Sequence, residues 1–271
     1  MLSKRGLTSA VTALLLTIAA SVIVPAALAT AAGTCHAFPA PRVNWNGCDF
    51  SNANLNYAEL THASLVGTDL HNASLYGANL NYANLTHAKL VGTDLREAYF
   101  VDATLDYANL TGAKFRSTVL NNADLYGVNL TRASGEASFW SVNLSRANFS
   151  DSNLSSSYYI DANFTNANFT NANFTNASLY GANLTGANLT YADLHQTDLD
   201  RANLSGARLD HTNLSNSDFA HADFYGAALV YANLGGATFT GATFLFVTWK
   251  HTICPDGTDS NNDGGTCIHN F

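Results

Sequence analysis

The residues best suited to bind a ligand lie near the C-terminus, in the segment "DSNNDG". Asp259, Asn261 and Asp263 supply oxygen atoms at alternate positions, and Gly264 follows at the turn. This spacing is typical of the start of a calcium-binding loop, in which oxygen ligands wrap a hard cation. The twelfth position of such a loop is Asn270 instead of an acidic residue. Calcium binding is therefore one interpretation, and a turn-rich loop of Asn, Asp and Gly is the favoured one.

The N-terminal segment has the three parts of a secretory signal peptide. The basic start "MLSKRG" precedes the apolar run "LTSAVTALLLTIAASVIV", and "PAALATAA" offers small residues for cleavage after Ala29 or Ala31. A retained membrane anchor is the alternative interpretation. No later apolar run approaches the roughly 20 residues that span a membrane. We therefore expect residues 1–29 to be removed and the mature chain to be exported to the extracellular space, the periplasm or a photosynthetic lumen.

The charge balance of the chain is acidic. It contains 12 basic and 20 acidic residues, and loss of Lys4 and Arg5 with the signal peptide leaves a net charge near −10. This sign argues against binding of nucleic acid or anionic lipid through phosphate groups.

Four cysteines lie near the two ends of the sequence: Cys35, Cys48, Cys254 and Cys267. Cysteines of an exported protein are expected to form disulfides, and four of them allow three pairings.

No arrangement of residues indicates catalysis. The sequence lacks a G-x-S-x-G elbow, an H-E-x-x-H zinc motif and a phosphate-binding glycine loop. We therefore expect a protein that is not an enzyme and that uses no cofactor, calcium excepted.

A large apolar residue recurs every five positions, with a small residue two places before it. These central residues, called centres below, run from Phe50 to Leu130 and from Phe139 to Trp249, and 26 of the 40 are Leu and 12 are Phe. A five-residue step advances about 140° around an α-helix, so the centres would form no stripe. On a strand, consecutive centres would point to opposite faces. The pattern therefore predicts a backbone that bends once per repeat.

Segments such as "ANLTG", "ANLTY" and "ADLHQ" resemble the pentapeptide repeat family, whose consensus is A-(N/D)-L-x-x, and the resemblance covers residues 48–250. It implies an all-β fold, a right-handed quadrilateral parallel β-helix in which four five-residue sides make one coil. We expect about ten coils over residues 50–250. An N-terminal cap would comprise residues 30–49, and a C-terminal cap residues 251–271.

The implied fold also restricts the disulfides. Coils stacked about 4.8 Å apart make a rod roughly 50 Å long, whereas the Cα atoms of a disulfide lie within about 7 Å. Local pairing then remains, Cys35 with Cys48 and Cys254 with Cys267. Both bridges would fix caps over the terminal coils.

The repeat loses one residue between Leu130 and Phe139. These centres are nine positions apart where ten are expected, and Gly135 occupies the position of a centre. Glycine tolerates the tight path that a missing corner residue imposes. We expect a kink or small cavity at 131–138 and no domain boundary.

The twenty-residue coil predicts which side chains share a column. Asn163, Asn183 and Asn203 should lie one above another and form an outward amide ladder. His211 and His251 share a column but lie two coils apart, roughly 10 Å. We therefore expect the histidines, like most of the tyrosines, to be exposed on the surface and to form no metal site.

Three functions are compatible with these observations. The first is a non-enzymatic scaffold, an exported rod that binds a protein or a cell-envelope polymer. Neither the partner nor the oligomeric state can be deduced from the sequence.

The second function is implied by the resemblance, since some family members mimic DNA and bind DNA gyrase. Export argues against this function. So does the column of Asp49 and Asp69, because it continues with the basic residue Lys89. The third is a surface that binds ice or a crystalline polymer. It requires matched Thr or aromatic rows, against which the 25-residue duplications at 56–130 work.

Overall fold

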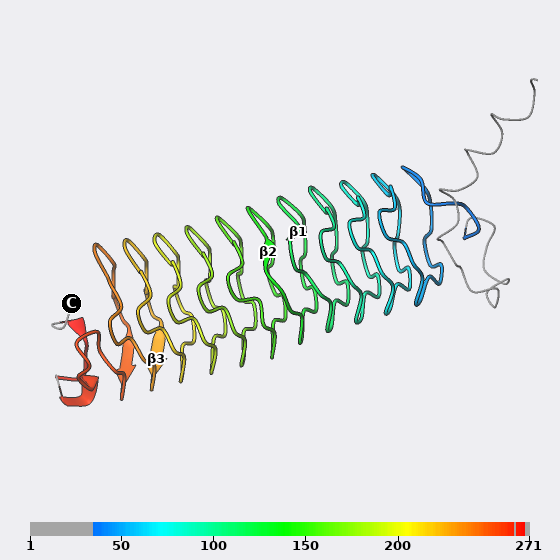
Figure 1. The fold of residues 1–271 in the computed structure, drawn as a ribbon. Helices are drawn as coiled ribbons and strands as arrows, with labels where there is room; N and C mark the ends of the chain where they lie inside the picture. Colours follow the sequence, from blue (N-terminus) through cyan, green and yellow to red (C-terminus); the bar gives the residue numbers. More distant parts are fainter. Residues whose placement is uncertain (1–34, 263, 269–271) are drawn as a thin grey trace, which may run out of the picture.

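The chain forms an elongated rod of stacked four-sided coils (Figure 1). The computed structural model describes residues 35–262 and 264–268, and the predicted signal peptide at 1–29 lies outside them. The repeats wind in one direction from one end of the rod to the other, so the two caps lie at opposite ends. The expected parallel β-helix is confirmed. Within the described ranges, no helix has the length and apolar character needed to cross a membrane.

Neighbouring coils are joined by parallel β-bridges between residues that are usually twenty apart, such as Asn163 with Asn183 and Asn183 with Asn203. On each side, the centre donates its N–H to the next coil, as Leu184 does to Asn203 at 2.7 Å. The residue before the centre donates to the preceding coil, as Asn183 does to Ala162 at 2.9 Å. These hydrogen bonds run along the rod, so each inner coil is held by both of its neighbours.

Most sides of the coils are extended over too few residues to form more than a single bridge. Longer pairing occurs in two places. β1 (Thr118–Val119) pairs in parallel with β2 (Ala137–Ser138), and β3 (Ala228–Val230) pairs in parallel with β4 (Thr248–Lys250). A 3₁₀ helix, η1 (Ser260–Asn262), lies in the C-terminal cap.

The chain turns at the two residues after each centre. The N–H of Ala187 donates to the carbonyl of Leu184 at 2.9 Å, and the second turn residue, Gly186, has a φ of 66°. The first turn residue, Thr185, does not have a positive φ. This combination defines a type II turn. Asn166 adopts the same conformation with a φ of 58°, so the corner does not require glycine. The turn supplies the bend that the five-residue period demands.

The centres fill the interior of the rod. Every centre from 50 to 234 has an exposed fraction of at most 2%. Aromatic centres stack directly, with 5.0 Å between the ring centroids of Phe149 and Phe169. Where threonine replaces the small alanine, its hydroxyl donates to a carbonyl of the preceding coil, as Thr93 does to Leu70 at 2.8 Å. The interior is therefore a filled apolar stack.

At the phase break, the chain passes close to the preceding coil. Gly135 has a φ of 109°, and a Cβ atom on it would lie 2.7 Å from the backbone nitrogen of Arg116. The strand that follows pairs Ala137 with Thr118, nineteen residues earlier. The series of parallel β-bridges between coils, called the ladder below, thus continues across 131–138, and the coil there has one residue fewer.

The ladder starts earlier than the sequence pattern predicts. Its first bridge joins Asn44 to Ser64, and Trp45 is buried with an exposed fraction of 1%. The expected cap at 30–49 therefore contains the beginning of the first coil. Val43 and Trp45 have the spacing of the repeat, but Val43 is larger than the usual alanine and Trp45 larger than the usual leucine, so the consensus does not identify them.

Both predicted disulfides are present. The Cα atoms are 5.6 Å apart in Cys35–Cys48 and 5.3 Å apart in Cys254–Cys267. Bridges that close loops of this length stabilise a fold by about 3 kcal/mol. In the C-terminal cap the chain folds back under the last coil, where Ile253 pairs antiparallel with Asp259. The disulfides therefore fix the two segments that flank the repeat.

Replacing Leu184 by Asp should prevent folding, because it places a charge without a partner in a dry interior; we expect a loss of roughly 5 kcal/mol or more. Asn183→Ala is the matched control, one residue away and on the outside. It removes hydrogen bonds to Thr165 and Thr185 and should cost about 1 kcal/mol. Circular dichroism melts of the purified variants measure both. Near-wild-type melting of Leu184→Asp would contradict the inward placement of the centres.

Replacing Gly135 by Ala should destabilise the rod by roughly 2–3 kcal/mol, because the φ of this residue is strained for alanine and its Cβ atom would meet backbone. Gly206→Asn is the control. Gly206 has a φ of 66° with open space around it, and Asn166 already adopts this turn conformation. Urea denaturation should therefore separate the two variants, and equal midpoints would show that the close approach at the phase break is not required.

Candidate binding surfaces

One side of the rod carries matched rows of amide and hydroxyl side chains over five successive coils. The asparagines are ladder partners in one column, and each is followed two residues later by Thr or Ser. We call this surface the amide face, and it comprises Asn109, Asn129, Asn148, Asn168, Asn188, Thr111, Thr131, Ser150, Thr170 and Thr190. No charged residue interrupts these two rows.

Hydrogen bonds within the amide face fix its side chains. The hydroxyl of Thr170 donates to Oδ1 of Asn168 at 2.6 Å, and Nδ2 of Asn188 donates to the oxygen of Thr170 at 3.0 Å. Nδ2 of Asn168 contacts Ser150 in the same way, at 2.8 Å. The hydroxyl protons are thus used within the face, which is rigid and neutral.

Matched rows are present on the amide face, although the 25-residue duplications work against them. Asn109 and Asn129 lie within the duplicated copies, in which the same column also carries Asp69 and Lys89. Beyond residue 130 the triplet Asn-x-Thr/Ser recurs in successive five-residue repeats. A twenty-residue step therefore meets the same triplet again. Rows of this kind are what a repeating polymer would contact.

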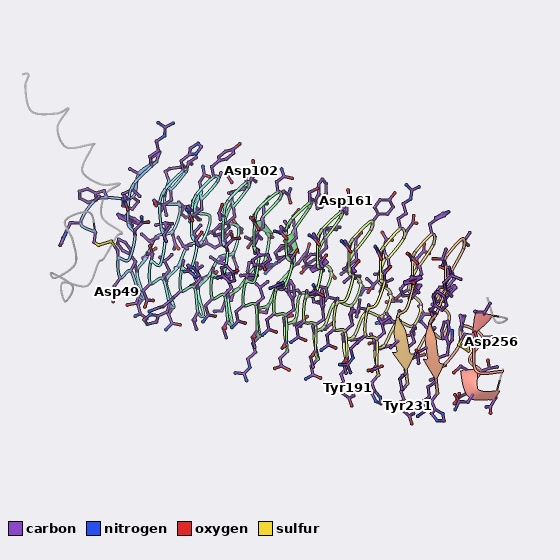
Figure 2. The ribbon with its side chains drawn as sticks, turned by 180° about the vertical axis from the view of Figure 1, so that it is seen from behind. Asp49, Asp102, Asp161, Tyr191, Tyr231 and Asp256 are labelled. Atoms are coloured by element: carbon purple, nitrogen blue, oxygen red, sulfur yellow. A yellow bond between two sulfur atoms is a disulfide. The ribbon has the colours of Figure 1, made fainter. Side chains whose placement is uncertain are left out.

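Aromatic rings form a column on one corner, next to the amide face. Tyr191, His211, Tyr231 and His251 stack with centroids 4.7, 4.9 and 4.9 Å apart and ring planes within 12° of parallel. We call them the Tyr–His column. Figure 2 shows Tyr191 and Tyr231 along one edge of the rod. Their exposed fractions are 57% and 49%. Because the rings cover one another's faces, the column presents its ring edges and polar atoms to a partner.

Two of the three predicted calcium ligands, Asp259 and Asn261, are described by the structure, and both make other contacts. Oδ1 of Asp259 accepts the backbone N–H of Asn261 at 2.9 Å, and Oδ1 of Asn261 accepts the N–H of His251 at 3.0 Å. Asp263 lies outside the described residues. Among 35–262 and 264–268, no group of three His, Cys, Asp or Glu residues could hold a metal ion. Calcium binding remains a prediction, and the described contacts fix the loop to the last coil.

Acidic residues do not form a row along the described ladder. The Asp49–Asp69 column continues with Lys89, which approaches Asp69 at 3.4 Å. The other successive pair, Asp198 and Asp218, is followed by a threonine. Figure 2 shows Asp102 and Asp161 on the corner opposite the Tyr–His column, well separated along the rod. The negative charge is therefore dispersed over the surface.

One carboxyl group is held in an unfavourable position. Asp106 lies beside Asp124 of the next coil, and its Oδ1 atom is buried without a hydrogen-bond partner. Burial, followed by the charge of Asp124, raises the pKa of Asp106 above its usual value. On the same side of the rod, other coils carry Thr or Ser at the position of Asp106, for example Thr165 and Thr185.

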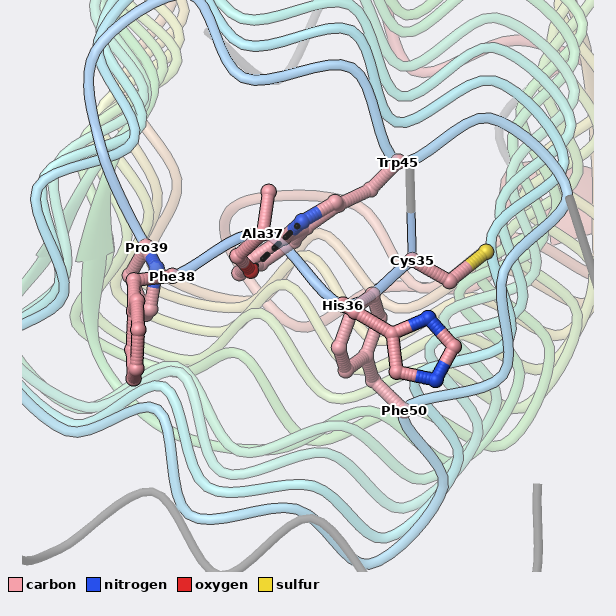
Figure 3. A pocket seen from close by; sticks show the side chains of 7 residues that line it. All are labelled: Cys35, His36, Ala37, Phe38, Pro39, Trp45 and Phe50. Carbon is pink, nitrogen blue, oxygen red and sulfur yellow. Dashed lines mark hydrogen bonds between the residues drawn. The ribbon is translucent and has the colours of Figure 1, made fainter. Parts of the chain in front are cut away.

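A cavity of about 140 Å³ opens in the N-terminal cap, above the first coil (Figure 3). The indole of Trp45 crosses it, and its Nε1–H donates to the carbonyl of Ala37 at 3.2 Å. The ring centroids of Trp45 and Phe50 are 4.2 Å apart. We call this cavity the cap pocket; it is lined by Cys35, His36, Ala37, Phe38, Pro39, Trp45 and Phe50. The sequence pattern did not indicate it, since its only signal is that Trp45 lies five residues before Phe50.

Comparison with known families identifies the architecture. A family model described as pentapeptide repeats matches eight segments, which together cover residues 42–132 and 135–244. The chain belongs to the pentapeptide repeat family. Among curated proteins, no relative matches the chain.

Several solved structures are similar to this chain. HetL, a pentapeptide repeat protein involved in heterocyst differentiation regulation in the cyanobacterium Nostoc sp. strain PCC 7120, is 32% identical, with coverage of 81% of this chain and 92% of HetL and a TM-score of 0.45. A pentapeptide repeat protein from the Arabidopsis thaliana thylakoid lumen is 27% identical, with coverage of 42% and 69% and a TM-score of 0.20. The plasmid-mediated fluoroquinolone resistance protein QnrB1 is 18% identical, with coverage of 75% and 90% and a TM-score of 0.35.

Asp106→Asn should stabilise the rod at neutral pH. A pKa raised in the folded state means that the protonated form of Asp106 favours folding, fully below the ordinary value of 3.8 and decreasingly as the pH rises through the folded pKa. The amide keeps the shape without the charge, so the variant should gain on the order of 0.5 kcal/mol at pH 7, since solvent partly screens a side chain that is not fully buried. Thermal melts between pH 3 and 8 should show this advantage disappearing in acid. Asp102→Asn, on an exposed corner, is the control, and an equal gain there would refute the explanation.

Proposed function

We propose that this pentapeptide repeat protein is an exported, non-enzymatic scaffold, a rod that binds a protein or a cell-envelope polymer through its outer faces. The observation that supports this most is the filled interior, in which every centre from 50 to 234 is at most 2% exposed. A solid rod offers its sides and ends for contact. The two disulfides are typical of an oxidising compartment, in agreement with the export that the N-terminal segment predicts.

The Tyr–His column is the side surface best suited to a protein partner. Tyrosines are enriched at protein interfaces, because a large ring buries apolar area while its hydroxyl remains available for a hydrogen bond. In this column the rings are also stacked, so little side-chain freedom is lost on binding. Asp210 and Lys250 precede two of the rings along the chain, and Asp259 lies 3.5 Å from Nδ1 of His251. The column is therefore flanked by charges of both signs, which suits a polar partner surface.

The matched rows of the amide face favour a second candidate function, binding of ice or a crystalline polymer. The rows repeat once per coil, about 4.8 Å, and their side chains are held in place. Thermal hysteresis of the purified protein tests ice binding, and its absence would exclude that candidate. Mimicry of DNA toward gyrase receives less support, because it requires a continuous acidic surface and a cytoplasmic location.

The scaffold function predicts that the Tyr–His column contributes to partner binding. The full-length chain is expressed in its host, and the N-terminus of the product is determined by mass spectrometry; processing after Ala29 or Ala31 is expected. Binding of the purified product to the isolated cell-envelope fraction and to secreted proteins is then measured by co-sedimentation and affinity capture. Tyr191→Ser with Tyr231→Ser should weaken binding at least about tenfold, as loss of interface aromatic anchors does.

The matched control changes two exposed tyrosines elsewhere, Tyr57→Ser with Tyr82→Ser, whose exposed fractions are 67% and 52%. This variant should bind like the wild type if the Tyr–His column is the contact surface. Equal weakening by both double variants would remove the column from the proposal. An unprocessed protein confined to the cytoplasm would contradict the scaffold function itself.

A further inference from the structure

We propose that the cap pocket binds a small, uncharged molecule with a single aromatic ring, such as toluene. The size of the cavity, about 140 Å³, leads to this class. An apolar protein cavity of about 150 Å³ accommodates benzene, whereas pockets for drug-sized ligands have volumes of about 300–1,000 Å³. One ring therefore fits within the cap pocket, whereas a fused pair of rings would extend beyond its mouth.

The lining of the pocket selects an uncharged ligand. No acidic or basic side chain other than His36 lines it, and the polar edge of Trp45 is already bonded to the carbonyl of Ala37. A ligand therefore needs no polar group to accept a hydrogen bond from Trp45. Trp45 and Phe50, inclined at 39° to each other, offer aromatic surfaces against which a further ring packs edge-to-face or offset.

The mouth of the pocket exposes an aromatic side chain that a ligand would contact. Phe38 has an exposed fraction of 78%, the largest among the exposed large hydrophobic side chains of the described chain. Figure 3 shows Phe38 and Pro39 on one side of the opening and His36 and Phe50 on the other, with Trp45 between them. A ring bound there would cover part of the apolar surface of Phe38, which gains free energy in proportion to the area removed from water.

The pocket depends on the N-terminal disulfide. Five of its seven lining residues are the consecutive residues 35–39, and the bond from Cys35 to Cys48 attaches this segment to the first coil. Breaking the bond would free one end of the wall from the coil. Ligand binding should therefore require Cys35–Cys48 but not Cys254–Cys267, which lies at the opposite end of the rod.

The experiment follows the indole N–H signals in the ¹H–¹⁵N NMR spectrum of the protein purified after expression of the full-length chain. Toluene should cause a saturable shift of the Trp45 signal and leave that of Trp140, 49% exposed, in place. Naphthalene at the same concentration should cause no such shift. The absence of a saturable Trp45 shift, or equal shifts for Trp45 and Trp140, would overturn the proposal.

Matched variants make the test independent of folding. Ala37→Leu fills the cavity from its wall and should weaken toluene binding at least about tenfold, with an unchanged melting temperature of the rod. Cys35→Ser with Cys48→Ser should abolish binding, and Cys254→Ser with Cys267→Ser should preserve it. Wild-type binding by Ala37→Leu would overturn the assignment of the site. Tighter binding of N-acetyl-phenylalaninamide than of toluene would assign the pocket to a protein side chain and overturn the small-molecule class.

The proposal does not rest on the scaffold function. Partner binding that is insensitive to Ala37→Leu, together with toluene binding that is sensitive to it, would support both proposals separately.

Discussion

The type II turn after each centre is the constraint on which the rest of the structure depends. It limits each side to five residues and sets the coil at four sides, so that the backbone N–H and C=O groups of a side point along the rod and meet those of the neighbouring coils. A single side gains too few hydrogen bonds to be stable alone. Stability is therefore shared between successive coils, as in other solenoids.

The same constraint gives the surface its order. Side chains twenty residues apart lie one coil apart, close enough for like residues to interact. Asparagines bond to the asparagines and hydroxyls of the preceding coil, and Tyr191 stacks on His211. Binding surfaces built in this way are pre-organised, because their side chains are already fixed by neighbours of the same kind. The same stacking is unfavourable where two neighbouring side chains carry like charges, as for Asp106 beside Asp124.

The ends of the rod follow different rules, since a terminal coil has only one neighbour. At the N-terminal end, a disulfide-linked segment covers the first coil incompletely and leaves the cap pocket. At the C-terminal end, Ile253 pairs antiparallel with the returning cap, while Leu245 and Phe246 of the last coil remain 65% and 76% exposed. The disulfides, the cap pocket and these exposed apolar side chains thus lie at the two ends, where the periodic packing stops.

The sequence by itself determined the coil, the burial of the centres, the disulfide pairs and the columns of Asn, Tyr and His. The five-residue period predicted one bend per repeat, and the resemblance to the pentapeptide repeat family implied four sides per coil. Counting residues was then sufficient for the rest, because in a periodic fold the neighbours of a residue follow from its number. The tertiary structure alone decided that Trp45 begins the first coil, that the hydroxyls of the amide face donate to their own asparagines, and that Asp106 faces Asp124. The cap pocket, too, could be found only in the tertiary structure. The walls of that pocket come from a segment with no period, whose path is set by one disulfide and by the packing of Trp45, and such contacts do not follow from spacing.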